Sequence, residues 1–241
     1  MKILYLCLSL MIFSSCSIFE DEVFENTDNN LMSEEDIIKE KSPPFSFFKA
    51  LQSVEREEIE VSDEYNKLIT KPLGYAAWVG HSSFVINNYD LNIISDPMFS
   101  DRASPFQFLG PKRLIEPAIG YKNLPKIDVV VISHNHYDHL DLKSVKKLNK
   151  LNPDTIFLVP LKLKNWFLSK GIKNVYEFEW WESKIIENTT FTFVPVQHWS
   201  RRGLFDKNKS LWGGWWIENS NIKLVHLGDT CLLYTSDAAD E

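Results

Sequence analysis

The chain has 241 residues, of which 44% are hydrophobic, and it carries a formal net charge of −7. This length and apolar content suffice for one sizeable core, and the acidic balance excludes the basic footprint of a nucleic-acid-binding protein. The three cysteines, Cys7, Cys16 and Cys231, lie near the two ends of the chain and imply no disulfide framework.

The first residues are typical of a targeting signal. A charged start precedes an apolar run over residues 3–13, and Ser14-Ser15-Cys16 follow it. The run is too short for a permanent membrane-spanning helix, and its flanks are those of an export signal. The residues before Cys16 resemble a bacterial lipobox, although Phe13 stands where leucine is usual. We therefore predict a lipoprotein-type signal peptide over residues 1–16 and a membrane-anchored lipoprotein of the bacterial cell envelope; a secreted or periplasmic protein is the alternative.

Residues 17–72 are predicted to form a polar, acidic tether and N-terminal extension, because the composition shifts to acidic and polar residues there. The negative charge of this segment disfavours an electrostatic grip on anionic headgroups, so the lipid would do the anchoring. Phe47, Phe48 and Leu51 form an apolar stripe at helical spacing. We interpret the stripe as packing against the domain, with contact at a membrane interface as the alternative.

The middle of the chain predicts a strand, a metal-binding loop and a helix in succession. Ile127 to Ile132 form an apolar, β-branched run typical of a buried strand, and residues 142–148 place apolar side chains among lysines at helical spacing. Between them, residues 133–141 contain the pattern H-x-H-x-D-H. Imidazole and carboxylate are ligands that Zn²⁺ accepts. Two histidines one residue apart can converge on one ion, and the adjacent Asp138 and His139 can serve a second.

Two further candidate ligands follow predicted strands. Residues 189–196 predict a strand that leads to His198, and residues 223–227 predict one that leads to Asp229. Layered α/β folds usually place their chemistry at the carboxyl ends of strands. His198 alone could equally be structural, and Asp229 beside Gly228 could be a turn residue; their shared position after strands favours a role as ligands.

These motifs together resemble the metallo-β-lactamase fold superfamily and, within it, the branch of N-acyl-phosphatidylethanolamine-hydrolysing phospholipase D. The resemblance extends over residues 78–230. It is carried by Gly80-His81-Ser82-Ser83, Ser95-Asp96-Pro97, Arg102-Ala103-Ser104-Pro105, Gly110-Pro111-Lys112-Arg113, Ser133 to Asp141, Trp180-Trp181-Glu182, Gln197-His198-Trp199 and Gly228-Asp229-Thr230. It implies an α/β fold, the αββα sandwich, with the hydrolase domain over residues 73–230.

The resemblance also implies a centre of two Zn²⁺ ions. In this centre His134, His136 and His198 hold one ion, Asp138 and His139 hold the other, and Asp229 bridges both. The superfamily supplies one more histidine to the second ion, but the sequence has no histidine after Asp229. His81 and His226 are interpreted as supporting or structural residues.

Residues 231–241 resemble nothing in the family and look like one reading frame of a sequencing adapter. We therefore expect a non-native tail there and a domain that is incomplete at its C-terminus. A divergent C-terminus is the alternative.

The implied activity is zinc-dependent hydrolysis of an N-acyl-phosphatidylethanolamine-like phospholipid to phosphatidic acid and an N-acylethanolamine. A water shared by two metal ions is activated for attack on phosphorus, and Asp138 would orient it. Asp96 is expected to support a ligating histidine, with an Asp-Pro turn as the alternative. Gln107 and Phe108 fall at substrate-contacting positions of the family, with phenylalanine where tyrosine can occur.

Other interpretations remain open for the substrate and for the aromatic residues. The chain could be a zinc hydrolase of another ester such as a lactone, or a non-catalytic lipoprotein that retains the fold. Six tryptophans could line an acyl groove or pack in the core; they are Trp180, Trp181, Trp199, Trp212, Trp215 and Trp216. The sequence predicts no oligomeric state.

Overall fold

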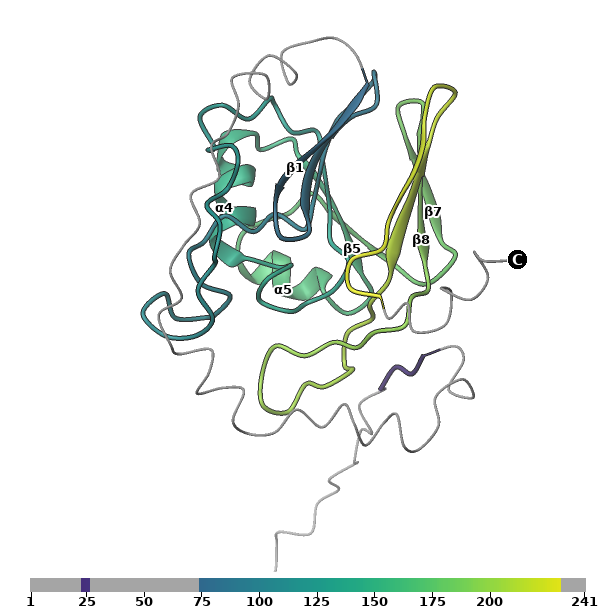
Figure 1. The fold of residues 1–241 in the computed structure, drawn as a ribbon. Coiled ribbons are helices and arrows are strands. Elements are labelled where there is room, and N and C mark those ends of the chain that lie inside the picture. Colours follow the sequence, from purple (N-terminus) through teal and green to yellow (C-terminus); the bar gives the residue numbers. More distant parts are fainter. Residues whose placement is uncertain (1–22, 27–73, 231–241) are drawn as a thin grey trace, which may run out of the picture.

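The computed structural model describes residues 23–26 and 74–230 (Figure 1). The predicted signal peptide, most of the predicted tether, the stripe from Phe47 to Leu51 and the predicted non-native tail lie outside these residues and stay predictions. No helix of the described segments has the length and hydropathy needed to cross a membrane.

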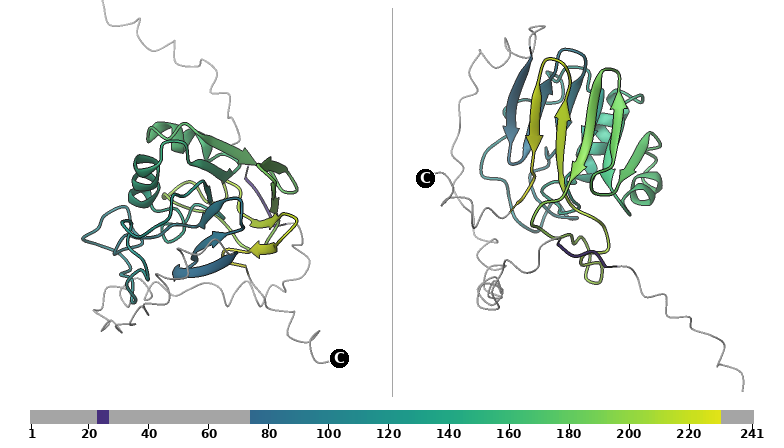
Figure 2. Two further views of the ribbon diagram at one scale, coloured as in Figure 1. Left: turned by 90° about the horizontal axis from the view of Figure 1, so that it is seen from above. Right: turned by 90° about the vertical axis from the view of Figure 1, so that its right-hand side faces the viewer.

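Ten strands form two sheets in the described part of the chain. The larger sheet has the order β1-β2-β3-β4-β5-β6, in which β1 to β3 pair antiparallel and β3 to β6 pair parallel. Its strands are β1 (Tyr75–Gly80), β2 (Ser83–Asn87), β3 (Asn92–Ser95), β4 (Val129–Val131), β5 (Ile156–Pro160) and β6 (Val175–Phe178). The smaller sheet is antiparallel with the order β10-β9-β8-β7. Its strands are β7 (Ser183–Ile186), β8 (Thr189–Val194), β9 (Gly214–Glu218) and β10 (Lys223–His226), and Figure 2 shows them beside the larger sheet.

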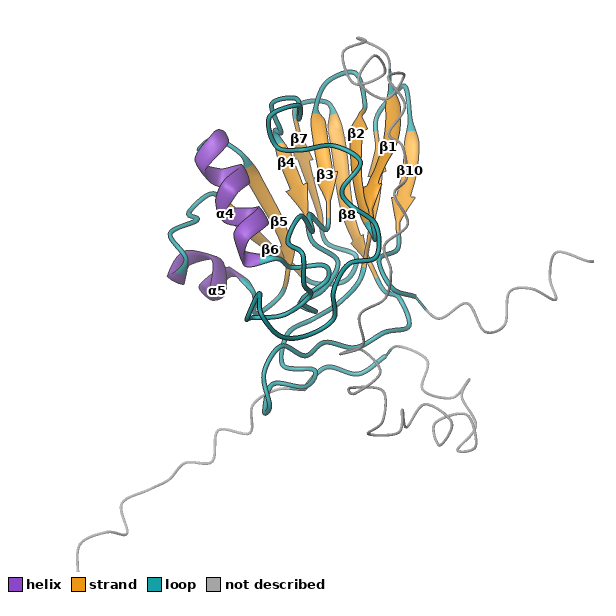
Figure 3. Ribbon diagram, turned by 60° about the vertical axis from the view of Figure 1, so that its left-hand side comes forward, coloured by secondary structure: helices purple, strands orange, loops and turns teal. Residues whose placement is uncertain are grey.

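Two helices, α4 (Leu142–Leu151) and α5 (Lys164–Ser169), cover the outer face of the larger sheet (Figures 1 and 3). Helix α4 starts after Asp141, whose carboxylate accepts a hydrogen bond from the Lys143 N–H at 3.1 Å. Such an N-cap satisfies a backbone donor that would otherwise lack a partner. The buried side of α4 carries Val145 and Leu148. The predicted helix is thus confirmed and extends three residues further.

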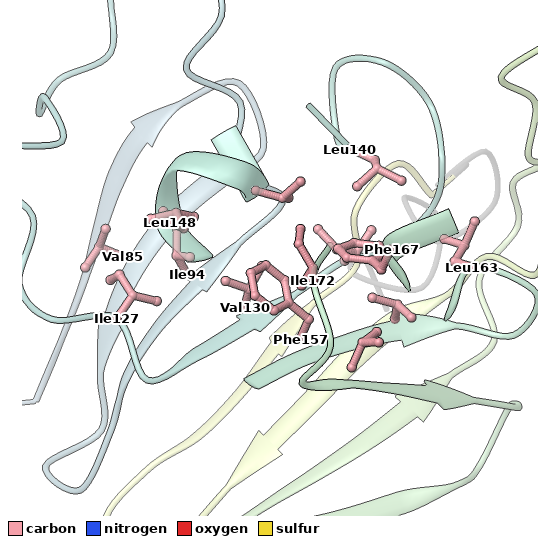
Figure 4. Close-up of a cluster of buried hydrophobic side chains, with 14 of the residues drawn as sticks. Val85, Ile94, Ile127, Val130, Leu140, Leu148, Phe157, Leu163, Phe167 and Ile172 are labelled. Atoms are coloured by element: carbon pink, nitrogen blue, oxygen red, sulfur yellow. The ribbon is translucent and has the colours of Figure 1, made fainter. Parts of the chain in front are cut away.

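Apolar side chains fill two layers on either side of the larger sheet. One layer lies between this sheet and the helices and includes Val130, Leu148, Phe157 and Phe167 (Figure 4). The other lies between the two sheets, where residues of β3 to β5 meet residues of β8 and β9. Continuous apolar runs such as β4 occur because both faces of the strand are buried. These layers confirm the predicted α/β sandwich; in the described residues the helices cover one outer face of it.

The tryptophans divide between the core and the surface. Trp212 and Trp215 are fully buried, and the Trp215 indole N–H donates to the Ile132 carbonyl at 2.8 Å. Trp180 packs at the edge of the layer between the sheets. Of the six tryptophans considered in the sequence, the other three keep exposed surface; they are Trp181, Trp199 and Trp216.

Candidate metal centre

The candidate site lies where five strands end on the same side of the sandwich. Strands β1, β3 and β4 of the larger sheet run in one direction, as do β8 and β10 of the smaller sheet. The loops that follow these strands gather at one end of the molecule (Figure 3). They carry His81 after β1, Asp96 after β3, the loop of residues 133–141 after β4, His198 after β8 and Asp229 after β10.

Three imidazole nitrogens converge in the first group, formed by His134, His136 and His198. His134 Nε2 lies 2.7 Å from His136 Nδ1, and His198 Nε2 lies 3.1 Å from the former and 3.2 Å from the latter. Burial, followed by the charge of neighbouring histidines, lowers the pKa of all three histidines, that of His198 to about 4. Neutral imidazoles whose lone pairs face one point are the donor set that a zinc ion takes.

The second group contains Asp138, His139 and, unexpectedly, His81. His81 Nε2 lies 3.1 Å from Asp138 Oδ2 and 3.2 Å from His139 Nε2. Burial alone would raise the pKa of Asp138, but a hydrogen bond from His81 and the charge of His139 lower it to about 2. Asp138 is therefore a carboxylate at neutral pH, and it supplies the negative charge that a second cation needs.

Asp229 lies between the two groups and contributes to a third set of ligand atoms with His134 and His139. Its Oδ1 is 3.2 Å from His139 Nε2, and its Oδ2 is 4.0 Å from His198 Nε2. Gly228, with φ of 58°, permits this approach, because a Cβ there would lie 2.6 Å from the Ser133 side chain. The two oxygens of Asp229 thus face different groups, as a bridging carboxylate requires. The residues predicted as ligands are thus brought together, and their donor atoms fit a metal-binding site.

A fully buried carboxylate, that of Asp96, lies behind the second group and forms hydrogen bonds to its histidine His139. His139 Nδ1 lies 2.9 Å and His226 Nε2 lies 2.8 Å from Asp96 Oδ2, which also accepts from the Ser133 hydroxyl at 2.6 Å. Asp96 Oδ1 accepts from the Ser133 N–H at 2.7 Å. Burial opposes ionisation of Asp96, but the two histidines more than offset it and lower its pKa.

This support fixes which nitrogen of His139 faces the site. Because the Asp96 carboxylate accepts from Nδ1–H, Nε2 is directed towards Asp138 and Asp229. Burial would lower the pKa of His139, but the charge of Asp96 and the hydrogen bond to Asp229 raise it to about 10. A metal ion at Nε2 must therefore displace a proton.

The sequence interpretation missed the roles of two residues at the site, His81 and Arg202. His81 was interpreted as supporting or structural, yet its Nε2 lies among the second group. Arg202 donates to the carbonyls of Asn135 and Leu140 at 2.9 and 2.8 Å and stacks on Tyr137, which holds the metal loop from outside. No pattern around Arg202 signals this contact. His81 and Asp96 also have φ values of 49° and 37°, a backbone conformation that often marks functional positions.

Residues 23–26, which lie in the predicted tether, contact the loop that carries His198. The Asn26 side-chain oxygen accepts from the His198 N–H at 3.1 Å and from the Trp212 indole N–H at 3.2 Å. Phe24 N–H donates to the Asn208 carbonyl at 2.9 Å. This short segment is therefore part of the support of the site.

The two predicted substrate-contacting residues lie on the loop between β3 and β4. The Gln107 side chain accepts from the Arg102 N–H at 3.3 Å and donates to the Arg102 carbonyl at 3.1 Å, so it shapes the loop. Phe108 is 81% exposed. Their role towards substrate stays a prediction.

Comparison with known proteins identifies the family to which the chain belongs. The family described as “Beta-lactamase superfamily domain” matches residues 91–240. The chain is 39% identical over 165 residues to N-acyl-phosphatidylethanolamine-hydrolyzing phospholipase D 1 of Caenorhabditis elegans, covering 65% of this chain and 46% of the relative. It is 37% identical over 163 residues to the mitochondrial enzyme of the same name from Saccharomyces cerevisiae, covering 65% and 34%. The chain thus spans less than half the length of these relatives.

The fold also matches solved structures. The isothiocyanate hydrolase from Delia radicum gut bacteria aligns with a TM-score of 0.50 at 16% identity, covering 65% of this chain and 63% of that one. A likeness at this identity concerns the fold alone.

Proposed function

The chain belongs to the β-lactamase superfamily, and from this premise we propose that the complete protein is a zinc-dependent phosphodiesterase of the phospholipase D type. Its substrate would be an N-acyl-phosphatidylethanolamine-like phospholipid, and its products phosphatidic acid and an N-acylethanolamine. One observation carries the proposal: the ligand atoms of three overlapping groups converge at the strand ends, with Asp229 between them. The names of the worm and yeast relatives support the choice of substrate.

Most residues of the site would bind zinc, and Asp96 would orient one of the ligands. His134, His136 and His198 would hold one zinc ion, Asp138 and His139 the other, and Asp229 both. Such ions would supply positive charge to a phosphodiester and make a water more acidic. Asp138 would accept a hydrogen bond from the attacking water and orient it towards phosphorus. Asp96 keeps His139 in the tautomer that presents Nε2.

The test combines metal analysis with product detection on the complete protein. We expect about two zinc ions per chain and zinc-dependent release of N-palmitoylethanolamine from N-palmitoyl-phosphatidylethanolamine, measured by mass spectrometry. His198→Gln should lose zinc and product release together, whereas Asp154→Asn, a substitution on an exposed turn, should keep both. Two ions with lactone hydrolysis but no phospholipid cleavage would indicate another hydrolase. A chain that binds no metal would indicate a non-catalytic lipoprotein.

For its location we propose a lipid anchor at Cys16 in a bacterial cell envelope, supported by the apolar run and the small residues that precede this cysteine. Expression in a bacterial host with a labelled fatty acid tests it. Label on the wild type and none on Cys16→Ser would support the anchor. An unlabelled, released wild-type protein would indicate plain secretion.

A further inference from the structure

Residues 23–26 form a short strap on the domain, although residues 27–73 separate them from β1 in the sequence. Their side chains alternate, since Val23 and Glu25 are exposed whereas Phe24 and Asn26 are partly buried. Such alternation is typical of an extended segment that lies with one face on the protein. Figure 1 shows the strap in purple beside the loop that follows β8.

The contacts of the strap lie at the end of the sandwich that carries the candidate metal centre. Phe24 packs against the apolar layer between the two sheets, and its N–H donates to the Asn208 carbonyl at 2.9 Å. Asn208 in turn closes the loop after β8, because its N–H donates to the Ser200 carbonyl at 2.7 Å. Asn26 accepts from the N–H of the candidate ligand His198 at 3.1 Å. The strap is thus attached where the ligand loops gather (Figure 2).

This attachment shortens the connection between the domain and the lipid anchor proposed at Cys16. Val23 follows Cys16 by seven positions, whereas residue 74 follows it by 58. An extended chain spans at most about 3.5 Å per residue, so the two connections reach about 25 Å and about 200 Å, respectively. The strap therefore keeps the metal-centre end of the domain within about 25 Å of the anchor.

The shorter connection also changes how often the site meets the membrane surface. For a flexible linker, the effective concentration of the tethered group falls about as the −3/2 power of linker length. A connection of seven positions instead of 58 thus raises the effective concentration of the site at the anchoring surface roughly 20-fold.

We propose that the strap of residues 23–26 orients the domain with its metal centre towards the bilayer that holds the anchor, so that the site receives phospholipid from that same bilayer. The inference rests on the anchor and the substrate proposed above. It changes the role of the predicted tether, because only residues 17–22 then separate the anchor from the domain. The partner of this end of the domain is the phospholipid leaflet around Cys16.

The first test compares two insertions in the complete, lipidated protein bound to vesicles whose lipid carries a headgroup quencher. Twenty Gly-Ser residues are placed either between residues 22 and 23 or between residues 60 and 61. A fluorophore is attached at Leu204→Cys, on the exposed loop that the strap contacts, or at Ser220→Cys, on the exposed turn between β9 and β10 at the opposite end. Any other free thiol is replaced by serine.

Without an insertion, quenching should be several times stronger at residue 204 than at residue 220. The insertion before the strap should remove most of this difference, because 20 flexible residues add about 25 Å to the connection. The insertion after the strap should leave the difference unchanged. Equal effects of the two insertions, or equal quenching at the two labels without an insertion, would overturn the proposal.

Substitutions within the strap provide a second test by the same quenching measurement. Phe24→Asp and Asn26→Leu remove its apolar contact and its acceptor, and each should reduce the difference between the two labels. Val23→Ser is the matched control, since Val23 is 55% exposed, and should behave as the wild type. An undiminished difference in both strap variants would contradict the role of the strap.

A third measurement separates the strap from the proposed substrate. Vesicles that carry the protein contain N-palmitoyl-phosphatidylethanolamine, and added vesicles without protein contain its deuterated form. We expect undeuterated product to dominate, and only the insertion before the strap to raise the deuterated product. Equal amounts of both products without an insertion would overturn the orientation. No product from either vesicle, with the expected quenching, would refute the substrate and leave the orientation intact. A protein that does not bind vesicles would refute the anchor and the orientation with it.

Discussion

Asp96→Asn is the most informative single substitution, because it removes one charge and changes little else. Asparagine has nearly the same shape and tolerates the φ of 37° found at this position. The side-chain amide of asparagine, however, has only one oxygen and cannot accept hydrogen bonds at both positions that the carboxylate oxygens occupy. Asp96 Oδ1 meets the Ser133 N–H and Oδ2 meets His139, His226 and the Ser133 hydroxyl, so either amide orientation turns an NH₂ group against a donor. Asp96 is fully buried, and removing one partner of a buried ion pair costs about 3–5 kcal/mol of unfolding free energy.

The same substitution should weaken the second metal site. Loss of the carboxylate that orients a ligating histidine typically lowers metal affinity about 10- to 100-fold. Zinc titration with a competing chelator, together with the visible spectrum of the cobalt-substituted protein, measures each site. Asp90→Asn is the matched control, since Asp90 is exposed and its Oδ2 accepts only a 3.4 Å hydrogen bond from Asn219. If Asp96→Asn retained wild-type stability and wild-type affinity for both ions, the assignment of Asp96 as a positioning residue would be refuted.

Three further predictions concern the supports of the site. Asn26→Leu removes the acceptor of two donors and should lower the unfolding free energy by about 1–3 kcal/mol; Asn26→Asp, which keeps the acceptor, should restore most of it in denaturant titrations. The pKa of His139 is raised to about 10, so zinc uptake at pH 7.5 should release about one proton from this histidine. Zinc affinity should therefore rise as the pH increases towards 10. Equal calorimetric heats of zinc binding in buffers of different ionisation enthalpy would contradict the proton release. Arg202→Lys keeps the charge but loses the guanidinium plane that stacks on Tyr137 and donates to two carbonyls. Thermal unfolding should show that the unfolding free energy falls by about 1.5–3 kcal/mol. An unchanged melting temperature would contradict the role of Arg202 in holding the loop of residues 133–141.

The sequence predicted the parts of the site that depend on local patterns. The β-branched run before residue 133 became β4, because a strand buried on both faces must be apolar throughout. The ligands after it are adjacent in sequence, so their proximity needs no knowledge of the fold. His198 and Asp229 were found through their shared place after strands, and β8 and β10 end as predicted within two residues.

Contacts between distant segments were not predictable in this way. His81 follows β1, and its approach to Asp138 depends on β1 having the same direction as β3 and β4. Asn26 reaches His198 across 172 positions of sequence, and the acidic composition around it gave no sign of such a contact. Composition and periodicity report local preferences, whereas these contacts are set by how strands pair.

The cluster around Asp96 explains why metal binding and folding should be linked in this protein. Asp96 follows β3 and Ser133 follows β4, both in the larger sheet, whereas His226 ends β10 of the smaller sheet. Their hydrogen bonds therefore tie the two sheets together directly beneath His139. A metal ion held by His139 and Asp229 would join the same two sheets a second time, one layer above. Since the unfolded chain cannot arrange these ligands, the free energy of metal binding adds to the stability of the sandwich.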